Sequence, residues 1–265
     1  TLMYFKGLPV MSSRLVLNRD AGAQGVPVAA SGAEASVGMD LAQAASFLRG
    51  GGAVVFPTET FYGVGCLAAH AQAVARVYQL KRRPVHKPLP LLAAHAAQVD
   101  EVAELAAMPR GLAAFWPGPL TVLLPARACL PQALVNDQGL VAVRVTPHPL
   151  AAQLAVEAGG ALTASSANLS GGEAVRTPQQ LDPALLTALQ DMARQILPAV
   201  CGNDHMTNQQ DMPPVLLGGP LPAGGLPSTV VEPLRGAAGA SERLRVVRAG
   251  AVSVAELVAA GFTVE

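Results

Sequence analysis

Apolar and polar positions follow a regular order only from about residue 40 onward. Their spacing predicts a helix that Asp40 caps and that the glycines at 50–52 end. The short apolar run at 53–56, which Pro57 closes, is typical of a buried strand. The patterned part of the chain therefore begins with a helix followed by a strand.

The same rules of spacing predict a longer alternation of elements. We expect helices at 74–81, 99–107, 110–115, 149–158 and 254–260. We expect strands at 88–92, 120–124, 141–145, 161–164, 228–231 and 244–247. Because strands and helices alternate, the sequence predicts an α/β fold with a largely buried sheet.

Two segments lack this patterning. Residues 1–38 show no sustained period, so we expect a poorly ordered N-terminal extension ahead of one domain at 39–265. Met11 and Met39 are alternative start residues. The polar stretch at 201–214 interrupts the pattern and is interpreted as a surface insertion.

The composition narrows the classes of function. Hydrophobic residues make up 51% of the 265 positions and charged residues 14%, which supports one large core. The 18 basic and 18 acidic residues cancel, so an anion site has to come from local clustering. The 3 cysteines form no CxxC pair, which disfavours a zinc cluster. We find no signal peptide and no apolar run of roughly 18 residues, so a cytoplasmic protein without membrane contact is expected.

The first cluster of candidate chemistry is P-T-E-T-F-Y-G-V-G at 57–65, directly after the first predicted strand. Ligands of open α/β sheets bind beyond the carboxyl ends of strands. Threonine hydroxyls and glycines that admit a close approach of backbone suit a ligand there. An ordinary turn, in which threonine satisfies backbone groups, explains the same residues equally well.

A basic turn, K-R-R-P-V-H-K-P at 81–88, lies between a predicted helix and a predicted strand. Its prolines fix the backbone between the cations. Arginine offers bidentate contacts and lysine a point charge, a combination that suits a polyphosphate. The alternative is that these cations complement the helix C-terminus, but the prolines favour anion binding.

Hydroxyls and one amide gather at 163–171, where Ser166 and Asn168 project to the same side of an extended backbone. These two side chains suit a phosphate or a ribose, although a helix-capping turn is slightly favoured locally. Arg144 lies inside an apolar strand and Arg248 ends a later one. Each arginine needs a partner such as a carboxylate, either from the protein or from a ligand.

Taken in order over about residues 40–260, these blocks resemble the YrdC family of threonylcarbamoyl-AMP synthases. The matching blocks are PT(D/E)TxYG at 57–63, KxRPxxKPL at 81–89, WPGPLT at 116–121, VxVR at 141–144, SANxSG at 166–171, STVV at 228–231 and a VxRxG block ending at Gly250. One block departs from many relatives, because Leu217 stands where they carry an Asp before a glycine pair.

The resemblance implies an open, twisted mixed sheet with flanking helices around a concave central cavity, in the short single-domain type. It implies a nucleotidyltransferase that joins L-threonine, bicarbonate or CO2, and ATP with Mg²⁺, and releases pyrophosphate. A downstream transferase complex would then modify adenosine 37 of tRNAs that read ANN codons. A weak direct contact with tRNA is a further expectation.

The family's motifs also imply roles for individual side chains. Those on the threonine side are Thr60, Arg144, Ser228 and, as a looser match, Leu92. Those on the nucleotide side are Lys81, Arg83, Lys87, Ser166, Asn168 and Arg248. Ser166 and Asn168 would also hold magnesium, and with Lys81 and Arg83 they form the expected catalytic group. Arg144 would pair with the threonine carboxylate.

Two other functions remain open from the sequence. An RNA-binding module without catalysis is disfavoured by the zero net charge and the 4% of aromatic residues. A paralogue similar to YciO or to the carbamoyltransferases that mature hydrogenases would activate another substrate. The intact basic and SAN blocks favour the threonine enzyme.

Overall fold

The computed structural model describes residues 38–169, 171–201, 213–234 and 242–265. These residues belong to one compact unit. The predicted extension at 1–38 and most of the predicted insertion at 201–214 lie outside the described residues, so both stay predictions.

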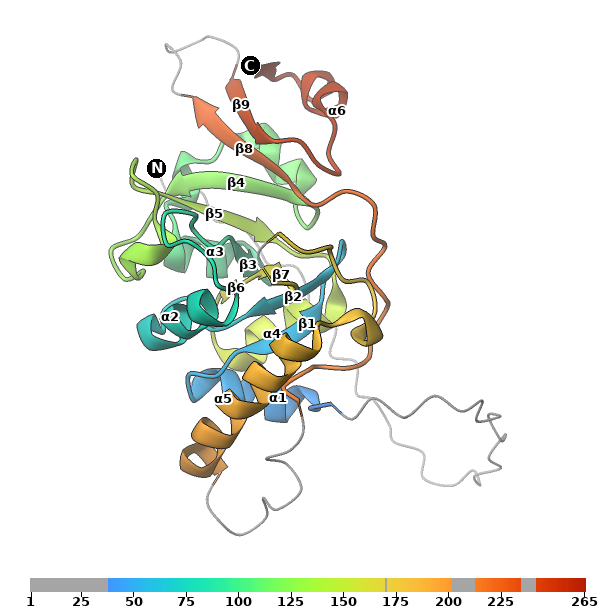
Figure 1. Cartoon of the computed structure of the whole chain (residues 1–265). Helices are drawn as coiled ribbons and strands as arrows, with labels where there is room; N and C mark the ends of the chain where they lie inside the picture. Colours follow the sequence, from blue (N-terminus) through green and yellow to red (C-terminus); the bar gives the residue numbers. More distant parts are fainter. Residues whose placement is uncertain (1–37, 170, 202–212, 235–241) are drawn as a thin grey trace, which may run out of the picture. The chain divides into compact units, whose positions relative to one another are not determined.

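The described strands form two sheets (Figure 1). Their bounds are β1 (Val54–Pro57), β2 (Tyr62–Gly65), β3 (Leu91–Ala93), β4 (Leu120–Pro125), β5 (Leu140–Val145), β6 (Leu162–Thr163), β7 (Ser165–Ser166), β8 (Thr229–Leu234), β9 (Arg243–Arg248) and β10 (Thr263–Val264). The larger sheet has the order β10–β9–β8–β4–β5–β3–β6, and β1, β2 and β7 form the smaller one. β3 runs parallel to β5, whereas β4 and β5 are antiparallel. This mixed α/β arrangement confirms the predicted class of fold.

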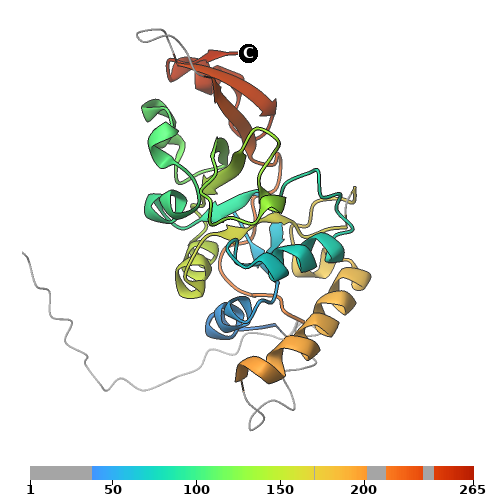
Figure 2. The ribbon, with the colours of Figure 1, turned by 90° about the vertical axis from the view of Figure 1, so that its left-hand side faces the viewer.

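Six of the described helices are α-helices. Their bounds are α1 (Leu41–Arg49), α2 (Ala71–Leu80), α3 (Ala96–Val102), α4 (Pro149–Ala158), α5 (Pro183–Cys201) and α6 (Val254–Ala259). Asp40 caps α1 and Ser253 caps α6, each in a reciprocal capping box, as their positions in the sequence predict. α1 contacts α4, α5 and β1, while α2 contacts β2 and α5. Figure 2 shows α2 and α5 side by side, and every residue of β1 and β2 is buried.

One edge of the larger sheet gathers the polar side chains of the later site. β5 ends there with Arg144 near its C-terminus, and β9 ends there with Arg248. β4 and β8 begin at the same edge, because β4 is antiparallel to β5 and β8 is antiparallel to β9. The turn between β1 and β2 faces this edge, since Glu59 in the turn contacts Arg144. Segments that are distant in the sequence therefore meet at one place.

Three helical or strand predictions differ from the structure. The helix expected at 99–107 ends at Val102, because Ala103 pairs with Ala126 as an isolated bridge. The helix expected at 110–115 is a 3₁₀ turn. The strand expected at 88–92 begins only at Leu91, since the prolines before it cannot donate to a ladder.

The segment at 57–65 is not only a turn. It is a hairpin, in which a tight turn at 58–61 joins β1 to β2. Strand β2 ends in glycine at position 65 because a Cβ there would lie 1.6 Å from the carbonyl oxygen of Thr163. Elements α5, β7 and β10 were not predicted from the sequence.

Candidate active site

Most of the predicted site residues converge on one cavity of about 460 Å³. This volume is within the range of about 300–1,000 Å³ that is typical of small-molecule sites. The predicted residues that line it are Thr60, Arg83, Arg144, Ser166, Asn168, Ser228 and Arg248. A second hollow of about 160 Å³ is lined by Lys81, Arg83, Lys87, Ser166 and Asn168, among others. The two spaces share four lining residues, Arg83, Ser165, Ser166 and Asn168, and are therefore neighbours.

Leu92 is the exception among the predicted site residues. Its side chain is fully buried in β3, and it lines neither of these two spaces. It lies beside Arg144 in the sheet, since the two residues are register partners. Leu92 therefore packs next to a site residue without facing the cavity.

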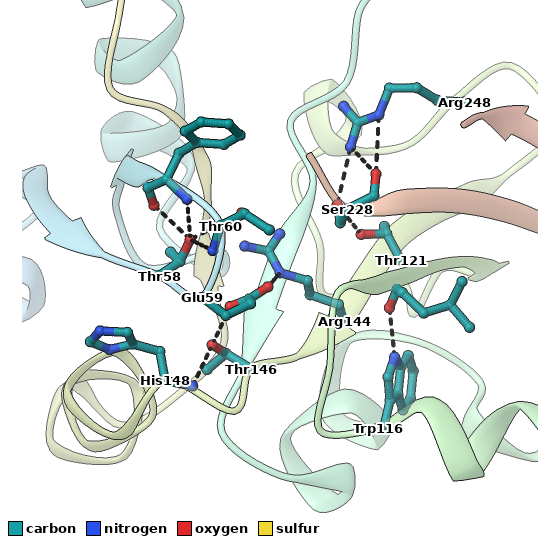
Figure 3. Close-up of polar contacts among 12 residues, drawn as sticks. Thr58, Glu59, Thr60, Trp116, Thr121, Arg144, Thr146, His148, Ser228 and Arg248 are labelled. Carbon is teal, nitrogen blue, oxygen red and sulfur yellow. Dashed lines mark hydrogen bonds and ion pairs between the residues drawn. The ribbon is translucent and has the colours of Figure 1, made fainter. Parts of the chain in front are cut away.

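The β1–β2 turn presents Thr60 to the cavity. Thr58 Oγ1 donates to the carbonyl oxygen of Phe61 at 2.6 Å, which closes the turn (Figure 3). The backbone N–H of Gly224 donates to the carbonyl oxygen of Thr60 at 2.9 Å, so the chain before β8 supports the turn from outside. Thr58 thus closes the turn, and the Thr60 hydroxyl lies 3.4 Å from Thr58 Oγ1 and lines the same cavity.

Arg144 has a partner from the protein. Its Nε lies 2.9 Å from Glu59 Oε1, and the two side chains are only 6% and 12% exposed. Glu59 Oε2 accepts a second hydrogen bond from Thr146 Oγ1 at 2.8 Å. Figure 3 shows the guanidinium extending beyond Glu59 toward the turn. Its Nη atoms make no hydrogen bond with any described residue, so they are available to a carboxylate ligand.

The sequence analysis assigned no role to Glu59. Two signals pointed to it: a carboxylate in a turn after a strand, and an unpaired arginine in an apolar strand. Only the structure shows that the two side chains meet across 85 positions of sequence.

Lys81 is buried and serves the backbone of β7 and the segment after it. Its Nζ donates to the carbonyl oxygens of Ser166 and Asn168, both at 2.5 Å. Burial, together with the positive charge of Arg83, lowers the pKa of Lys81 to about 8. An ammonium has three donors, so one remains for the smaller hollow.

Ser166 and Asn168 project to the same side, as predicted. Ser166 Oγ donates to Asn168 Oδ1 at 2.5 Å, and Asn168 Nδ2 donates to the carbonyl oxygen of Gly172. The Lys81 contacts hold the backbone behind this pair. The arrangement is a preformed set of oxygen and amide groups between the two spaces.

The basic turn after α2 is folded back on itself. Arg83 donates from Nε to the carbonyl oxygen of Lys87 at 2.7 Å and from Nη2 to that of Pro88 at 3.1 Å. Burial lowers the pKa of Arg83. Lys87 is exposed and lines only the smaller hollow. Arg83 thus makes two hydrogen bonds within the turn and lies at the junction of the two spaces.

Ser228 and Arg248 form the far wall (Figure 3). Arg248 Nη2 donates to the carbonyl oxygen of Ser228 at 2.6 Å and to its Oγ at 3.0 Å. The hydroxyl of Thr121 lies 2.9 Å from Ser228 Oγ, which fixes that side chain from behind. Desolvation lowers the pKa of Arg248, and the charges of Arg144 and Arg83 lower it further. Three guanidinium groups that repel one another favour an anionic ligand.

Within the described residues we find no group of three or more His, Cys, Asp or Glu side chains suited to a metal ion. The cavity walls thus offer cations, hydroxyls and an amide. Such a set binds and orients an anionic ligand more readily than it moves protons. Fold and site together define an α/β protein with a polar cavity whose walls carry three arginines.

Comparison with known families identifies the lineage. The model of the Sua5, YciO and YrdC proteins, described as "Telomere recombination", matches residues 46–198. The chain belongs to this family.

Two curated relatives carry the name "Threonylcarbamoyl-AMP synthase". The protein of Stenotrophomonas maltophilia is 39% identical over 155 residues, which are 57% of this chain and 83% of the relative. That of Methylococcus capsulatus is 44% identical over 146 residues, which are 54% of this chain and 78% of the relative. The similarity therefore includes most of each relative.

Two solved structures share the fold. P. abyssi Sua5 complexed with L-threonine aligns with a TM-score of 0.64 and 26% identity, over 85% of this chain and 58% of that chain. This chain thus spans little more than half of that protein. E. coli YciO aligns with a TM-score of 0.58 and 20% identity, over 81% of this chain and 90% of that chain. No helix among the described residues has the length and apolar character needed to cross a bilayer.

Proposed function

We propose that this protein is an L-threonylcarbamoyladenylate synthase, a nucleotidyltransferase that uses L-threonine, bicarbonate or CO2, and ATP. One observation carries the proposal: Arg83, Arg144, Arg248 and the Ser166–Asn168 pair line the same cavity of about 460 Å³. Relatives named threonylcarbamoyl-AMP synthase support this reading.

The threonine end of the proposed site lies around Arg144. Its unoccupied Nη edge suits a carboxylate, because arginine binds carboxylates through two parallel N–H donors. The hydroxyls of Thr60 and Ser228 lie on walls of the same cavity. They can exchange hydrogen bonds with the amine and hydroxyl of the substrate. The relative from P. abyssi was crystallised with L-threonine, which supports this assignment.

The nucleotide end lies around Arg83 and the Ser166–Asn168 pair. These groups border both spaces, so a triphosphate can extend from the larger cavity into the smaller hollow. Lys81 and Lys87 line that hollow and supply two further charges there. We assign Arg248, which lines the larger cavity, to the nucleotide as well.

The reaction requires little acid–base chemistry from the protein. The amine of threonine adds to CO2 and loses a proton, which gives a carbamate. A carbamate oxygen then attacks the α-phosphorus of ATP, the bond from that phosphorus to the bridging oxygen breaks, and pyrophosphate leaves. Because the carbamate is already anionic, positioning and charge stabilisation supply most of the catalysis.

Magnesium enters this proposal with the nucleotide. Ser166 Oγ and Asn168 Oδ1 are hard oxygen ligands that lie side by side, joined by a hydrogen bond that an ion would replace. Magnesium is usually held by few protein ligands together with substrate phosphates and water, so these two side chains fit an ion that arrives bound to the triphosphate. The ion would offset negative charge on the departing pyrophosphate.

The product is a mixed anhydride and needs an acceptor. We place this protein in the cytoplasm, upstream of a transferase complex that moves the threonylcarbamoyl group to adenosine 37 of ANN-decoding tRNAs. The zero net charge favours at most a weak direct contact with tRNA.

The test is a reaction of the purified protein with L-threonine, bicarbonate, ATP and Mg²⁺ in the absence of tRNA. We expect threonylcarbamoyl-AMP by mass spectrometry and an equal amount of pyrophosphate. Reactions without threonine or without bicarbonate serve as controls. Absence of pyrophosphate release would favour a binding module, and product formation only with another amino acid would favour a YciO-like paralogue.

A further inference from the structure

Glu59 is the one carboxylate that contacts an arginine of the cavity wall among the described residues. Both of its carboxylate oxygens are engaged: Oε1 accepts from Arg144 Nε at 2.9 Å and Oε2 from Thr146 Oγ1 at 2.8 Å. Glu59 itself does not line the cavity. It therefore acts on the site only through the groups that it holds.

The contact determines how Arg144 meets a ligand. A guanidinium is planar and its donors form a rigid fork, so fixing the Nε edge also fixes the direction of the Nη edge. A free arginine side chain would lose about 2 kcal/mol of rotamer entropy when it is ordered. The contact with Glu59 holds the Nε edge of Arg144 independently of a ligand, which is the basis of preorganised binding.

Glu59 also connects Arg144 to the turn. Its neighbour Thr60 presents a hydroxyl to the same cavity, and the backbone N–H groups of Ala223 and Gly224 donate to the carbonyl oxygens of Glu59 and Thr60. Glu59, which holds Arg144, and Thr60 are adjacent in the chain. The position of the guanidinium relative to the Thr60 hydroxyl is therefore fixed by the backbone between these two residues. Such a fixed pair suits a ligand that carries both a carboxylate and a hydroxyl.

We propose that Glu59 is a positioning residue for the amino-acid substrate: it orients Arg144 toward the carboxylate and sets its distance from Thr60. This inference rests on the proposed function. The role is one of geometry rather than charge. The negative charge of Glu59 by itself would weaken the attraction between Arg144 and the substrate carboxylate.

Two variants separate geometry from charge. Glu59→Gln keeps an oxygen that can accept from Arg144 Nε but removes the charge, whereas Glu59→Ala removes both. We expect the threonine KM to rise at least about tenfold in Glu59→Ala, the scale of one lost charge-assisted hydrogen bond. We expect Glu59→Gln to stay within about threefold of the wild type. The ATP KM is expected to change little in both.

A third variant keeps the test decisive if Glu59→Ala does not fold. Thr146→Val removes the hydroxyl that holds Oε2, and it is expected to raise the threonine KM by about twofold to fivefold with an unchanged ATP KM. Glu232→Ala is the matched control, since Glu232 pairs with Arg245 away from the cavity. Glu232→Ala is expected to leave the KM values for threonine and for ATP unchanged.

Calorimetric titration with L-threonine accompanies the kinetics, so that the two proposals fail separately. If the wild type binds threonine but makes no threonylcarbamoyl-AMP, the proposed function is wrong and the role of Glu59 is still measured. If folded Glu59→Ala binds threonine as the wild type does, the role of Glu59 is wrong. Equal damage in Glu59→Gln and Glu59→Ala, or a parallel rise of both KM values, would also overturn it.

Discussion

Lys81 holds Asn168 by its backbone: Nζ lies 2.5 Å from the carbonyl oxygen of Asn168, and equally close to that of Ser166. From the sequence, Lys81 was expected to meet a triphosphate. The structure gives it a second task, because two of its donors order the segment that carries the Ser166–Asn168 pair. A single buried cation thus connects the basic turn to the hydroxyl-rich one.

The protonation of Lys81 gives the first prediction. Burial and the charge of Arg83 lower its pKa from 10.5 to about 8, so in the free protein its charge is lost as the pH rises through about 8. We expect kcat/KM for ATP to fall above that pH, since this constant reports groups of the free enzyme. The fall should persist in Lys87→Ala. A profile that stays flat to a pH of about 9.5 would contradict it.

The free energy of unfolding should also depend on the protonation of Lys81, but it should rise with pH where kcat/KM for ATP falls. Between about pH 8 and 10.5 the unfolded chain binds more protons at Lys81 than the folded protein does. The contribution of Lys81 to the free energy of unfolding therefore rises with pH across this window. Thermal melts along the kinetic profile distinguish loss of charge from loss of fold.

Arg83 gives the second prediction. Its Nε and Nη2 are bonded to the turn, while Nη1 has no hydrogen bond to a described residue. We expect Arg83→Ala to raise the ATP KM by about 10–100-fold, the scale of a lost contact to a charged group, with little change for threonine. Arg82→Gly is the control: Arg82 lines neither space and has φ 49°, which glycine accepts readily. An equal effect of both variants would show that bulk charge, not Arg83, attracts ATP.

The sequence predicted those parts of the fold that are decided locally. The capped helices α1 and α6 and the apolar strands β4 and β5 have such local signals. Helix α5 had one too, since Leu185, Leu189, Ala193 and Ile196 are buried at helical spacing. It was missed although its period was readable.

Other features are decided by contacts between distant segments. β2 and β7 are short and rich in glycine or serine, so only their pairing makes them strands. The motifs indicated most of the side chains that line the two spaces, but not that Lys81 bonds to backbone or that Glu59 meets Arg144. Leu92 was a looser match to the family, and only the structure shows that it is fully buried beside Arg144 and lines neither space.

The close approach of β2 and β6 gives the third prediction. A Cβ on Gly65 would lie 1.6 Å from the carbonyl oxygen of Thr163, and backbone cannot give way as a side chain does. We expect Gly65→Ala to lower the free energy of unfolding by at least about 3 kcal/mol. Gly160→Ala is the control, because its Cβ would meet only Leu67 Cδ2 at 3.6 Å. Urea denaturation measures both, and a stable Gly65→Ala would mean that the two strands are farther apart.

The Arg144–Glu59 pair gives the fourth prediction, a double-mutant cycle on stability. Arg144→Ala leaves a nearly buried carboxylate without its cation, which is expected to cost about 3–5 kcal/mol. Glu59→Ala in addition removes the unpaired charge, so the double variant should be more stable than the sum of the single effects by about 1–3 kcal/mol. Threonine binding, however, should not return in the double variant, because the carboxylate-binding fork is still missing. Urea denaturation and threonine titration on the same proteins separate the two effects. Strict additivity of the unfolding free energies would mean that the ion pair is not coupled, and recovery of threonine binding without Arg144 would remove the carboxylate role from that residue.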